Sequence, residues 1–158
     1  MKILLQVWRT LPMWVHVLAM RMFRPRFRAA VAAMIFDEQG RILLFKHTYR
    51  KFEWGIPAGG LEHREQPEQA IIREFFEETG MQIEVQKLLL AESAMEDHSV
   101  SLIYLCKIMS GTFKESHEIS EMKYFDVNDL PQMLFAEKNL IHSVYKSLKE
   151  TTISLSIL

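Results

Sequence analysis

The sequence contains only one cysteine, Cys106, in a chain of 158 residues. A single cysteine cannot form an intramolecular disulfide, and it lacks the spacing of a zinc site. Cys106 stands in the apolar run SLIYLCKI, where a free cysteine behaves as a small hydrophobic side chain. We therefore expect a buried thiol without a catalytic role, in a protein of the reducing cytoplasm.

Long uninterrupted apolar runs are also missing. The first 27 residues contain many apolar side chains, but Arg9 and His16 interrupt them and no small-residue cleavage site follows. A membrane-spanning helix needs about 20 predominantly apolar residues. We expect neither a membrane span nor a signal peptide.

Acidic residues are absent before Asp37. Residues 1–28 carry a net charge of +6, whereas the rest of the chain carries −7. Within residues 1–27, Lys2, Gln6 and Arg9 recur along one narrow stripe, which predicts an amphipathic helix with a wide apolar face. Three roles stay open for this basic helix: packing on its own domain or across a homodimer, lying on an anionic membrane surface, and contacting RNA.

From residue 28 onward the pattern is that of a single α+β domain, residues 28–158, of a size that can bury one core. Apolar runs at 29–36 and 41–47 flank the turn signal DEQG and predict a β-hairpin. Further strands are expected at 54–58, 82–93, 99–108 and 121–127, and helices at 67–79, 128–134 and 136–149. This order predicts a mixed sheet with helices on its faces.

The stretch PAGGLEHREQPEQAIIREFFEETGM, residues 57–81, predicts a helix with an acidic face. Pro67 suits a first helical position, and Gly80 suits the residue just past the end. At about 100° per residue, an apolar face and an opposite charged face follow. The apolar face holds Ile71, Ile72, Phe75 and Phe76, and the charged face holds Arg73, Glu74, Glu77 and Glu78. We expect the apolar face in the core.

The crowded carboxylates need a positive partner. Each pair of like charges three or four residues apart on a helix costs about 0.2–0.5 kcal/mol. Arg73 relieves only part of this cost, by pairing with Glu77, and the preceding glycine-rich loop adds Glu62 and Glu65. A solvated acidic face is one interpretation. The other is a divalent cation such as Mg²⁺, which prefers several oxygen ligands and bridges to phosphates.

The same residues resemble the Nudix box, G-x5-E-x7-R-E-U-x-E-E-x-G-U, in which U is a bulky apolar residue. Every fixed position from Gly59 to Met81 is matched, and the pattern lies between a predicted strand and a predicted helix. A looser resemblance covers about residues 28–150. It implies a Nudix-like α/β/α sandwich that uses Mg²⁺ or Mn²⁺ to hydrolyse a phosphoanhydride bond in a nucleoside diphosphate linked to another group.

Site roles follow from this resemblance position by position. The metal ligands that it implies are Glu74, Glu77 and Glu78, supported by Glu65 and by the carbonyl of Ala58. Arg73 resembles the residue that orients the glutamates by ion pairing. The general base resembles Glu74 in some members of the family and a glutamate on a later loop in others, for which Glu118 is the candidate.

The box does not indicate the substrate. Family members often carry Pro-Gly where this sequence has His63-Arg64, so Arg64 is a candidate contact for a substrate phosphate. The other candidate contacts are Arg28 and the loop residues Tyr49, Arg50 and Lys51. Two alternative functions stay open, an RNA 5′-pyrophosphohydrolase and a non-catalytic sensor of nucleotide ligands, although a sensor is expected to lose the metal glutamates.

Overall fold

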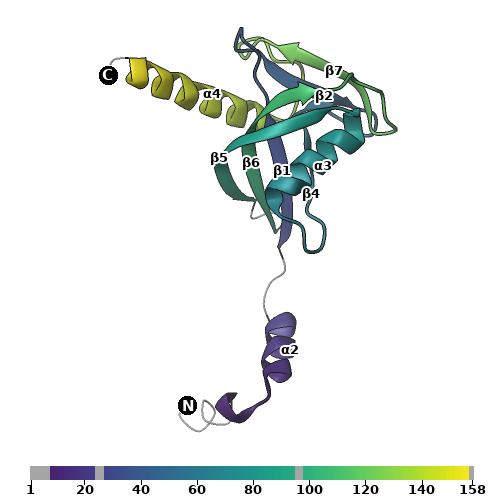
Figure 1. Cartoon of the computed structure of the whole chain (residues 1–158), viewed down its shortest axis with the longest axis vertical. Coiled ribbons are helices and arrows are strands. Elements are labelled where there is room, and N and C mark those ends of the chain that lie inside the picture. Colours follow the sequence, from purple (N-terminus) through teal and green to yellow (C-terminus); the bar gives the residue numbers. More distant parts are fainter. Residues whose placement is uncertain (1–7, 24–26, 95–97, 157–158) are drawn as a thin grey trace.

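The computed structural model describes residues 8–23, 27–94 and 98–156. Residues 1–7 of the predicted N-terminal helix lie outside the described residues. The elements in chain order (Figure 1) are α2 (Met13–Phe23), β1 (Arg28–Met34), β2 (Ile42–His47), β3 (Trp54–Gly55), β4 (Ala58–Gly60), α3 (Pro67–Thr79), β5 (Gln82–Ala94), β6 (Ser99–Ser110), β7 (Ile119–Phe125) and α4 (Phe135–Ser156).

The strands form two sheets, with the orders β4-β1-β6-β5 and β3-β2-β7. Strand β1 runs parallel to β6, whereas it pairs with β4 antiparallel. The pairs β5–β6, β2–β3 and β2–β7 are antiparallel as well. The first sheet is therefore mixed, as the sequence predicted.

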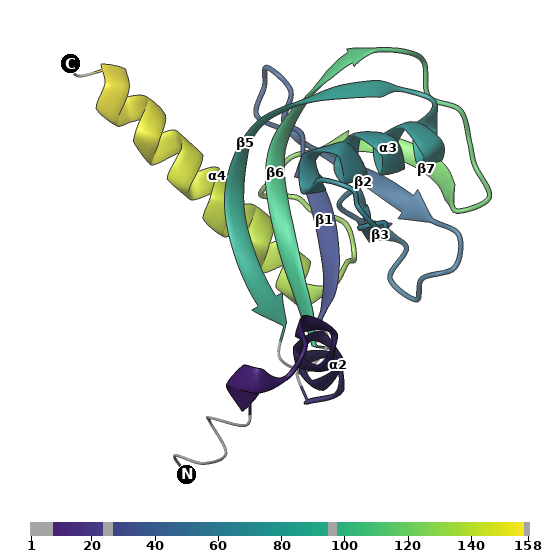
Figure 2. The same ribbon diagram turned by 60° about the horizontal axis from the view of Figure 1, so that its bottom comes forward.

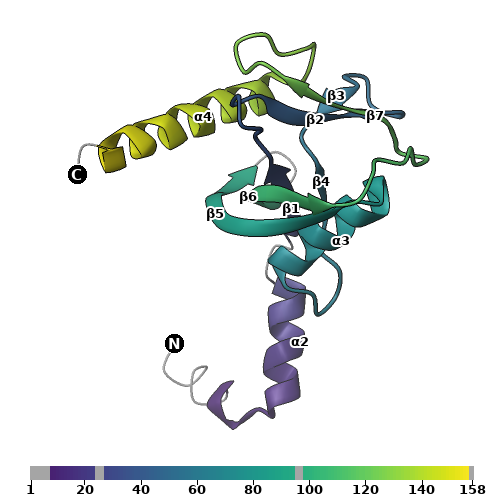
Figure 3. The ribbon, with the colours of Figure 1, turned by 45° about the horizontal axis from the view of Figure 1, so that its top comes forward.

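The core has two halves, one under each long helix. Successive residues of a strand point to opposite faces, so Val31 packs in the cluster that contains Phe75 of α3, while Ala32 packs in the cluster that contains Ile141 of α4. Figures 2 and 3 show α3 and α4 on opposite sides of β1 and β6. This arrangement confirms the α/β/α sandwich.

One prediction about strands is only partly confirmed, and another is wrong. The chain does turn back between β1 and β2, where Phe36 bridges antiparallel to Ile42 and the Leu43 N–H donates to Ile35 O at 2.9 Å, but the two strands belong to different sheets and do not continue as a regular hairpin. The single strand expected at 54–58 is two strands, with β3 in the three-stranded sheet and β4 in the four-stranded sheet. In both cases the chain crosses between the sheets, which local apolar patterning does not reveal.

The short helix predicted at 128–134 is also wrong. This segment forms turns, in which the Asp126 carboxylate accepts the Asn128 N–H at 2.8 Å. Pro131 lacks a backbone N–H, which disfavours a helix across this position. The helix that follows, α4, begins at Phe135.

Helix α3 has the predicted bounds but a different buried face. It begins at Pro67 and ends before Gly80, which has φ 71° and donates its N–H to Phe76 O at 2.7 Å. Ile72 and Phe76, expected in the core, are 37% and 51% exposed, whereas Glu78 is 9% exposed. The helix is rotated so that one metal-ligand candidate lies on its buried side.

Helix α2 stands apart from the sandwich. Figures 1 and 3 show it projecting from the start of β1, and the large side chains of Met13 and Trp14 are exposed. Packing of this helix against its own domain is therefore not seen. None of the described helices is long and apolar enough to cross a membrane.

Candidate active site

The two glycines of β4 lie directly against the acidic face of α3. A Cβ built on Gly59 would overlap the carboxyl group of Glu74, and its distance to Glu74 Oε1 would be 2.6 Å. The Gly60 N–H donates to the same Oε1 at 3.2 Å. The Glu74 carboxylate therefore lies so close to the backbone of β4 that residue 59 has to be a glycine.

The guanidinium of Arg73 gathers the surrounding carboxylates. Its Nε and Nη2 donate to the two oxygens of Glu65 at 2.9 and 3.0 Å. Its Nη1 lies 3.1 Å from an oxygen of Glu74 and 3.1 Å from one of Glu77, and Nη2 also donates to Gly60 O at 3.1 Å. The two-pronged bond from Arg73 holds the pKa of Glu65 below its ordinary value. Helix spacing had predicted only the pair with Glu77, whereas the family resemblance had implied that Arg73 orients several glutamates by ion pairing.

Glu78 is the buried member of the cluster. Its Oε2 is buried and has no hydrogen-bond partner. Burial, followed by the negative charges of Glu74 and Glu118, raises the pKa of Glu78 from 4.5 to about 7, against the opposing charge of Arg50. A cation beside Glu78 Oε2 would give this oxygen a partner and would offset the repulsion from Glu74 and Glu118.

Glu118 reaches the same place from the segment before β7. Its carbonyl accepts the Thr48 N–H at 2.9 Å, which attaches this segment to the end of β2. A hollow of about 220 Å³ lies here, lined by Glu74, Glu77, Glu78, Ser116, His117 and Glu118. The fold therefore brings both candidates for the general base to one hollow.

The donor set of this hollow fits a hard divalent cation in its chemistry. Carboxylate oxygens are the ligands that Mg²⁺ prefers, and the buried oxygen of Glu78 has no other partner. Within the described residues, no three acidic, histidine or cysteine side chains are gathered closely enough to hold an ion as they stand. Arg73 engages one oxygen of Glu74 and one of Glu77, so the other oxygen of each carboxylate would have to move closer to Glu78 for an ion to bind.

The other predicted residues lie around the hollow at different places. Ala58 is the first residue of β4 and precedes Gly59. Arg50 lies close enough for its charge to lower the pKa of Glu78. Tyr49 is exposed beside it, with its ring edge-on to His47 at 5.8 Å between centroids.

Three further candidates do not line this hollow. Lys51 lines a separate depression next to Trp54 and lies over the ring of Phe52. Arg64 is exposed in the loop after β4, where its φ is 68°. Arg28 begins β1, where it pairs with Ser99 and donates its backbone N–H to His98 O.

Two residues near the hollow were missed by sequence reasoning. His47 is buried, neither ring nitrogen has a hydrogen-bond partner, and burial together with the charge of Arg50 lowers its pKa to about 4. Its place two residues after Phe45 in a strand was a signal for an inward side chain. Glu137 pairs with Arg50 at 3.8 Å, but an acidic residue in the first turn of a helix is ordinary and gave no signal.

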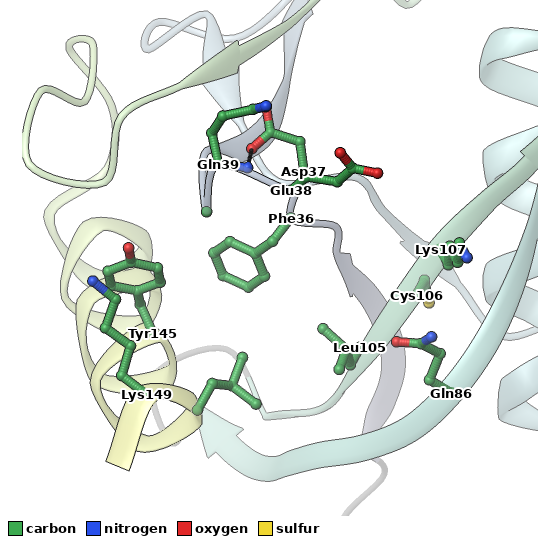
Figure 4. Close-up of a pocket in the computed structure, with 12 residues that line it drawn as sticks. Phe36, Asp37, Glu38, Gln39, Gln86, Leu105, Cys106, Lys107, Tyr145 and Lys149 are labelled. Carbon is green, nitrogen blue, oxygen red and sulfur yellow. Dashed lines mark hydrogen bonds between the residues drawn. The ribbon is translucent and has the colours of Figure 1, made fainter. Parts of the chain in front are cut away.

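A larger hollow of about 730 Å³ lies elsewhere, between the β1–β2 connection, β6 and α4 (Figure 4). Phe36 and Leu105 point into it, and Tyr145 faces it from α4. Asp37, which also lines it, is already engaged by Arg41. None of the predicted site residues lines this hollow. As expected, Cys106 is buried, and burial raises the pKa of its thiol to about 12.

Comparisons with known proteins agree with the geometry. The family model named NUDIX domain matches residues 26–146. An ADP-ribose pyrophosphatase of Methanocaldococcus jannaschii is 30% identical over 113 residues, which cover 68% of this chain and 67% of that protein. An RNA pyrophosphohydrolase of Saccharophagus degradans is 40% identical over 55 residues, 35% of this chain and 32% of that protein. The crystal structure of a UDP-X diphosphatase superposes with a TM-score of 0.69 at 24% identity, covering 84% of this chain and 70% of that one.

Proposed function

The chain belongs to the NUDIX family of hydrolases, and from this premise we propose that it hydrolyses a phosphoanhydride bond in a nucleoside diphosphate linked to another group, with Mg²⁺ or Mn²⁺ bound to its carboxylates. The observation that carries the proposal is the hollow in which Glu74, Glu77, Glu78 and Glu118 meet. A divalent cation would neutralise both the buried, repelled carboxylate of Glu78 and the phosphate chain of a substrate.

The metal would be held by carboxylates of α3. The proposed ligands are Glu74, Glu77 and Glu78, with Glu65 and the carbonyl of Ala58 in support. When bound, such an ion lowers the pKa of a water molecule and screens phosphate oxygens. Arg73 supports this proposal, because its bonds to Glu65 and Gly60 O hold it between the loop and the helix. We assign to Arg73 the positioning of Glu74 and Glu77.

The general base is one of two glutamates in the hollow. Glu74 is held in place by Arg73 and by the Gly60 N–H. Glu118 is exposed and approaches from the opposite segment. Glu118→Gln decides between the two. Loss of turnover with unchanged metal affinity would assign the base to Glu118, whereas turnover that is kept would leave Glu74, which is also a proposed metal ligand.

The substrate phosphates would meet cations around the hollow. Arg50 is the best placed of them, because its charge acts on Glu78. Tyr49 offers an exposed ring for a base. Arg28, Lys51 and Arg64 do not line the hollow and stay candidate contacts. We also propose that the enzyme works in the cytoplasm, which the free buried thiol of Cys106 supports.

A second candidate substrate is a 5′-triphosphorylated RNA end. The similarity to an RNA pyrophosphohydrolase favours it, although it covers only about a third of each chain. The excess of cations in residues 1–28 also suits a polyanion. RNA as substrate requires that cleavage of the RNA end exceeds that of free nucleotides and falls when residues 1–27 are removed.

The test is release of phosphate or pyrophosphate across a panel of substrates. Nucleoside triphosphates, ADP-ribose, other nucleotide sugars, dinucleoside polyphosphates and 5′-triphosphorylated RNA are each offered with Mg²⁺, Mn²⁺ or EDTA. Glu78→Gln serves as the blank. Cleavage that needs metal and is absent in the blank supports the proposal and names the substrate class. Metal binding without cleavage of any substrate would contradict it and favour a ligand sensor.

A further inference from the structure

Helix α2 presents large apolar side chains to solvent. Met13 is 75% exposed and Trp14 is 67% exposed, and Val17, Leu18 and Met22 are exposed on the same helix. Figures 1 and 3 show the helix away from the sandwich. An exposed group of this kind marks an interaction site, and its occupant has to come from outside the sandwich.

The charge around this helix restricts the occupant. No acidic residue precedes Asp37, while six cations do: Lys2, Arg9, Arg21, Arg24, Arg26 and Arg28. Pairing with the same helix of a second copy would bring cations only against cations, which is unfavourable in a symmetric interface. The cations favour an anionic partner, and the exposed apolar side chains of α2 favour a partner that is also apolar.

We propose that the segment containing α2 binds the surface of an anionic phospholipid bilayer. The helix would lie along the surface, because α2, with 11 residues, is too short to cross a bilayer. Its apolar side chains enter the boundary between headgroups and acyl chains, Trp8 and Trp14 suit the level of the headgroups, and the arginines meet lipid phosphates. RNA offers phosphates as well, but it offers no apolar phase for Met13, Val17 and Leu18.

Co-sedimentation of the full chain with vesicles tests this proposal. One vesicle set contains phosphatidylcholine alone, and the other contains phosphatidylcholine with phosphatidylglycerol. We expect binding to the anionic set, weakened by salt, and a loss of at least about tenfold in the double variant Met13→Ser/Trp14→Ser. Met109→Ser is the matched control, because Met109 is also exposed but lies on β6, and it should bind as the unchanged chain does.

Four results would overturn the membrane proposal. The first is absence of binding to anionic vesicles. The second is binding that the double variant keeps. The third is a dimer, detected by light scattering without lipid, that the double variant no longer forms. This result would assign the surface to a second copy. Binding of 5′-triphosphorylated RNA in place of vesicles would likewise assign it to nucleic acid.

A different observation concerns the polar groups around Arg50. Its Nη1 lies 3.8 Å from an oxygen of Glu137, and both side chains are mostly buried. The other oxygen, Glu137 Oε2, is buried without a hydrogen-bond partner, as are both ring nitrogens of His47 and Oε2 of Glu78. These are the unsatisfied buried side-chain atoms found in the described residues, and the charge of Arg50 acts on all three of these side chains.

The absence of a side chain at Gly55 leaves room for the pair formed by Arg50 and Glu137. A Cβ on Gly55 would lie 2.9 Å from Glu137 Oε2 and 3.1 Å from Arg50 Nη1. Glu137 stands in the first turn of α4, and the Ile56 N–H also bonds its carboxylate. The carboxylate is thus fixed from the backbone side, while Arg50 comes from the loop after β2.

We infer from this geometry that Glu137 is a positioning residue, which holds Arg50 beside the carboxylate hollow for contact with a substrate phosphate. The inference rests on the proposed function. At 3.8 Å the pair is loose enough that the guanidinium keeps donors for a second anion. The ion pair with Glu137 already restricts the side chain of Arg50. Arg50 therefore loses less conformational entropy when it binds a phosphate.

A double-mutant cycle tests this inference with two readouts. Glu137→Gln, Arg50→Gln and the double variant are compared for kcat/KM on the active substrate and for binding of inorganic pyrophosphate by calorimetry. We expect Glu137→Gln to weaken both by about tenfold in the presence of Arg50 and to have no further effect once Arg50 is gone. Glu150→Gln, an exposed glutamate of the same helix, should change neither quantity.

The outcomes distinguish the positioning role of Glu137 from the proposed hydrolysis. Losses that add fully in the double variant, or a Glu137→Gln variant that keeps normal pyrophosphate binding, would overturn the positioning role. Pyrophosphate binding that follows the cycle in a chain without metal-dependent turnover would uphold the positioning role while contradicting the proposed hydrolysis. Glu137→Asp, which keeps the charge, should recover part of the binding that Glu137→Gln loses.

Discussion

The carboxyl group of Glu74 occupies the space in which a side chain of residue 59 would begin. A Cβ on Gly59 would overlap Cδ and Cγ of Glu74, whereas a Cβ on the next residue, Gly60, meets no heavy atom within 4 Å. The two glycines are neighbours in β4 and both belong to the same loop-and-helix site. Only the first is required by the position of the carboxylate.

Gly59→Ala should therefore damage the site, while Gly60→Ala should not. The added methyl group pushes Glu74 away, with a loss of about 1–3 kcal/mol in stability and about a hundredfold in kcat/KM. Gly60→Ala serves as the matched control and should keep most of its activity. Thermal unfolding and initial rates at fixed metal concentration measure the two effects. Equal behaviour of both variants would contradict this account of the strand.

Stability without metal should depend on pH through Glu78. Its pKa of about 7 in the folded protein lies above the ordinary 4.5, so the folded state binds this proton more tightly than the unfolded state does. The contribution of Glu78 to stability is greatest below about pH 4.5 and falls by up to about 3 kcal/mol as the pH rises through 7.

Comparison with Glu78→Gln isolates this contribution, because His47 acts in the opposite direction. The pKa of His47 is lowered to about 4, so its contribution rises between about pH 4 and 6.5. We expect the stability difference between Glu78→Gln and the unchanged chain, measured in EDTA by denaturant unfolding, to grow in favour of the variant from pH 5 to about pH 7. The variant should also lack turnover. A constant difference would show that Glu78 titrates normally.

Arg73→Lys should keep the positive charge but lose the bonds that hold the surrounding carboxylates in place. A lysine cannot reproduce the two parallel bonds to Glu65 while also contacting Glu74 and Glu77. We expect kcat/KM to fall by about 10- to 100-fold and stability to fall by about 1 kcal/mol. Arg41→Lys, which alters an ion pair with Asp37 away from the hollow, is the control. Full activity in Arg73→Lys would mean that charge alone is needed there.

Arg64→Asn should stabilise the loop before α3. Arg64 has a φ of 68°, a left-handed conformation that asparagine tolerates better than arginine. We expect a gain of about 0.5 kcal/mol in the free energy of unfolding, measured by chemical denaturation, with no change for His63→Asn. The same variant examines the candidate phosphate contact: a raised KM would support contact with the substrate, and an unchanged KM would remove Arg64 from the candidates.

Local signals predicted α3 well, because its ends depend on single residues. Pro67 and Gly80 define the helix by their own backbone preferences, and the structure has the same bounds. Local signals succeeded only in part for β1 and β2, whose apolar runs looked like a regular hairpin. Two strands in different sheets have the same alternation as two paired strands, so only the tertiary arrangement distinguishes them.

The sequence by itself determined the residue types of the candidate site, which are the glutamates spaced between Gly59 and Met81, and the family to which the chain belongs. The tertiary structure decided how those groups act together. It turned Glu78 toward the core and brought Glu118 to its side. It also placed Glu137 behind Arg50. The reason is physical, since the types and spacing of residues are local properties, whereas burial and charge interactions depend on residues that are distant along the chain.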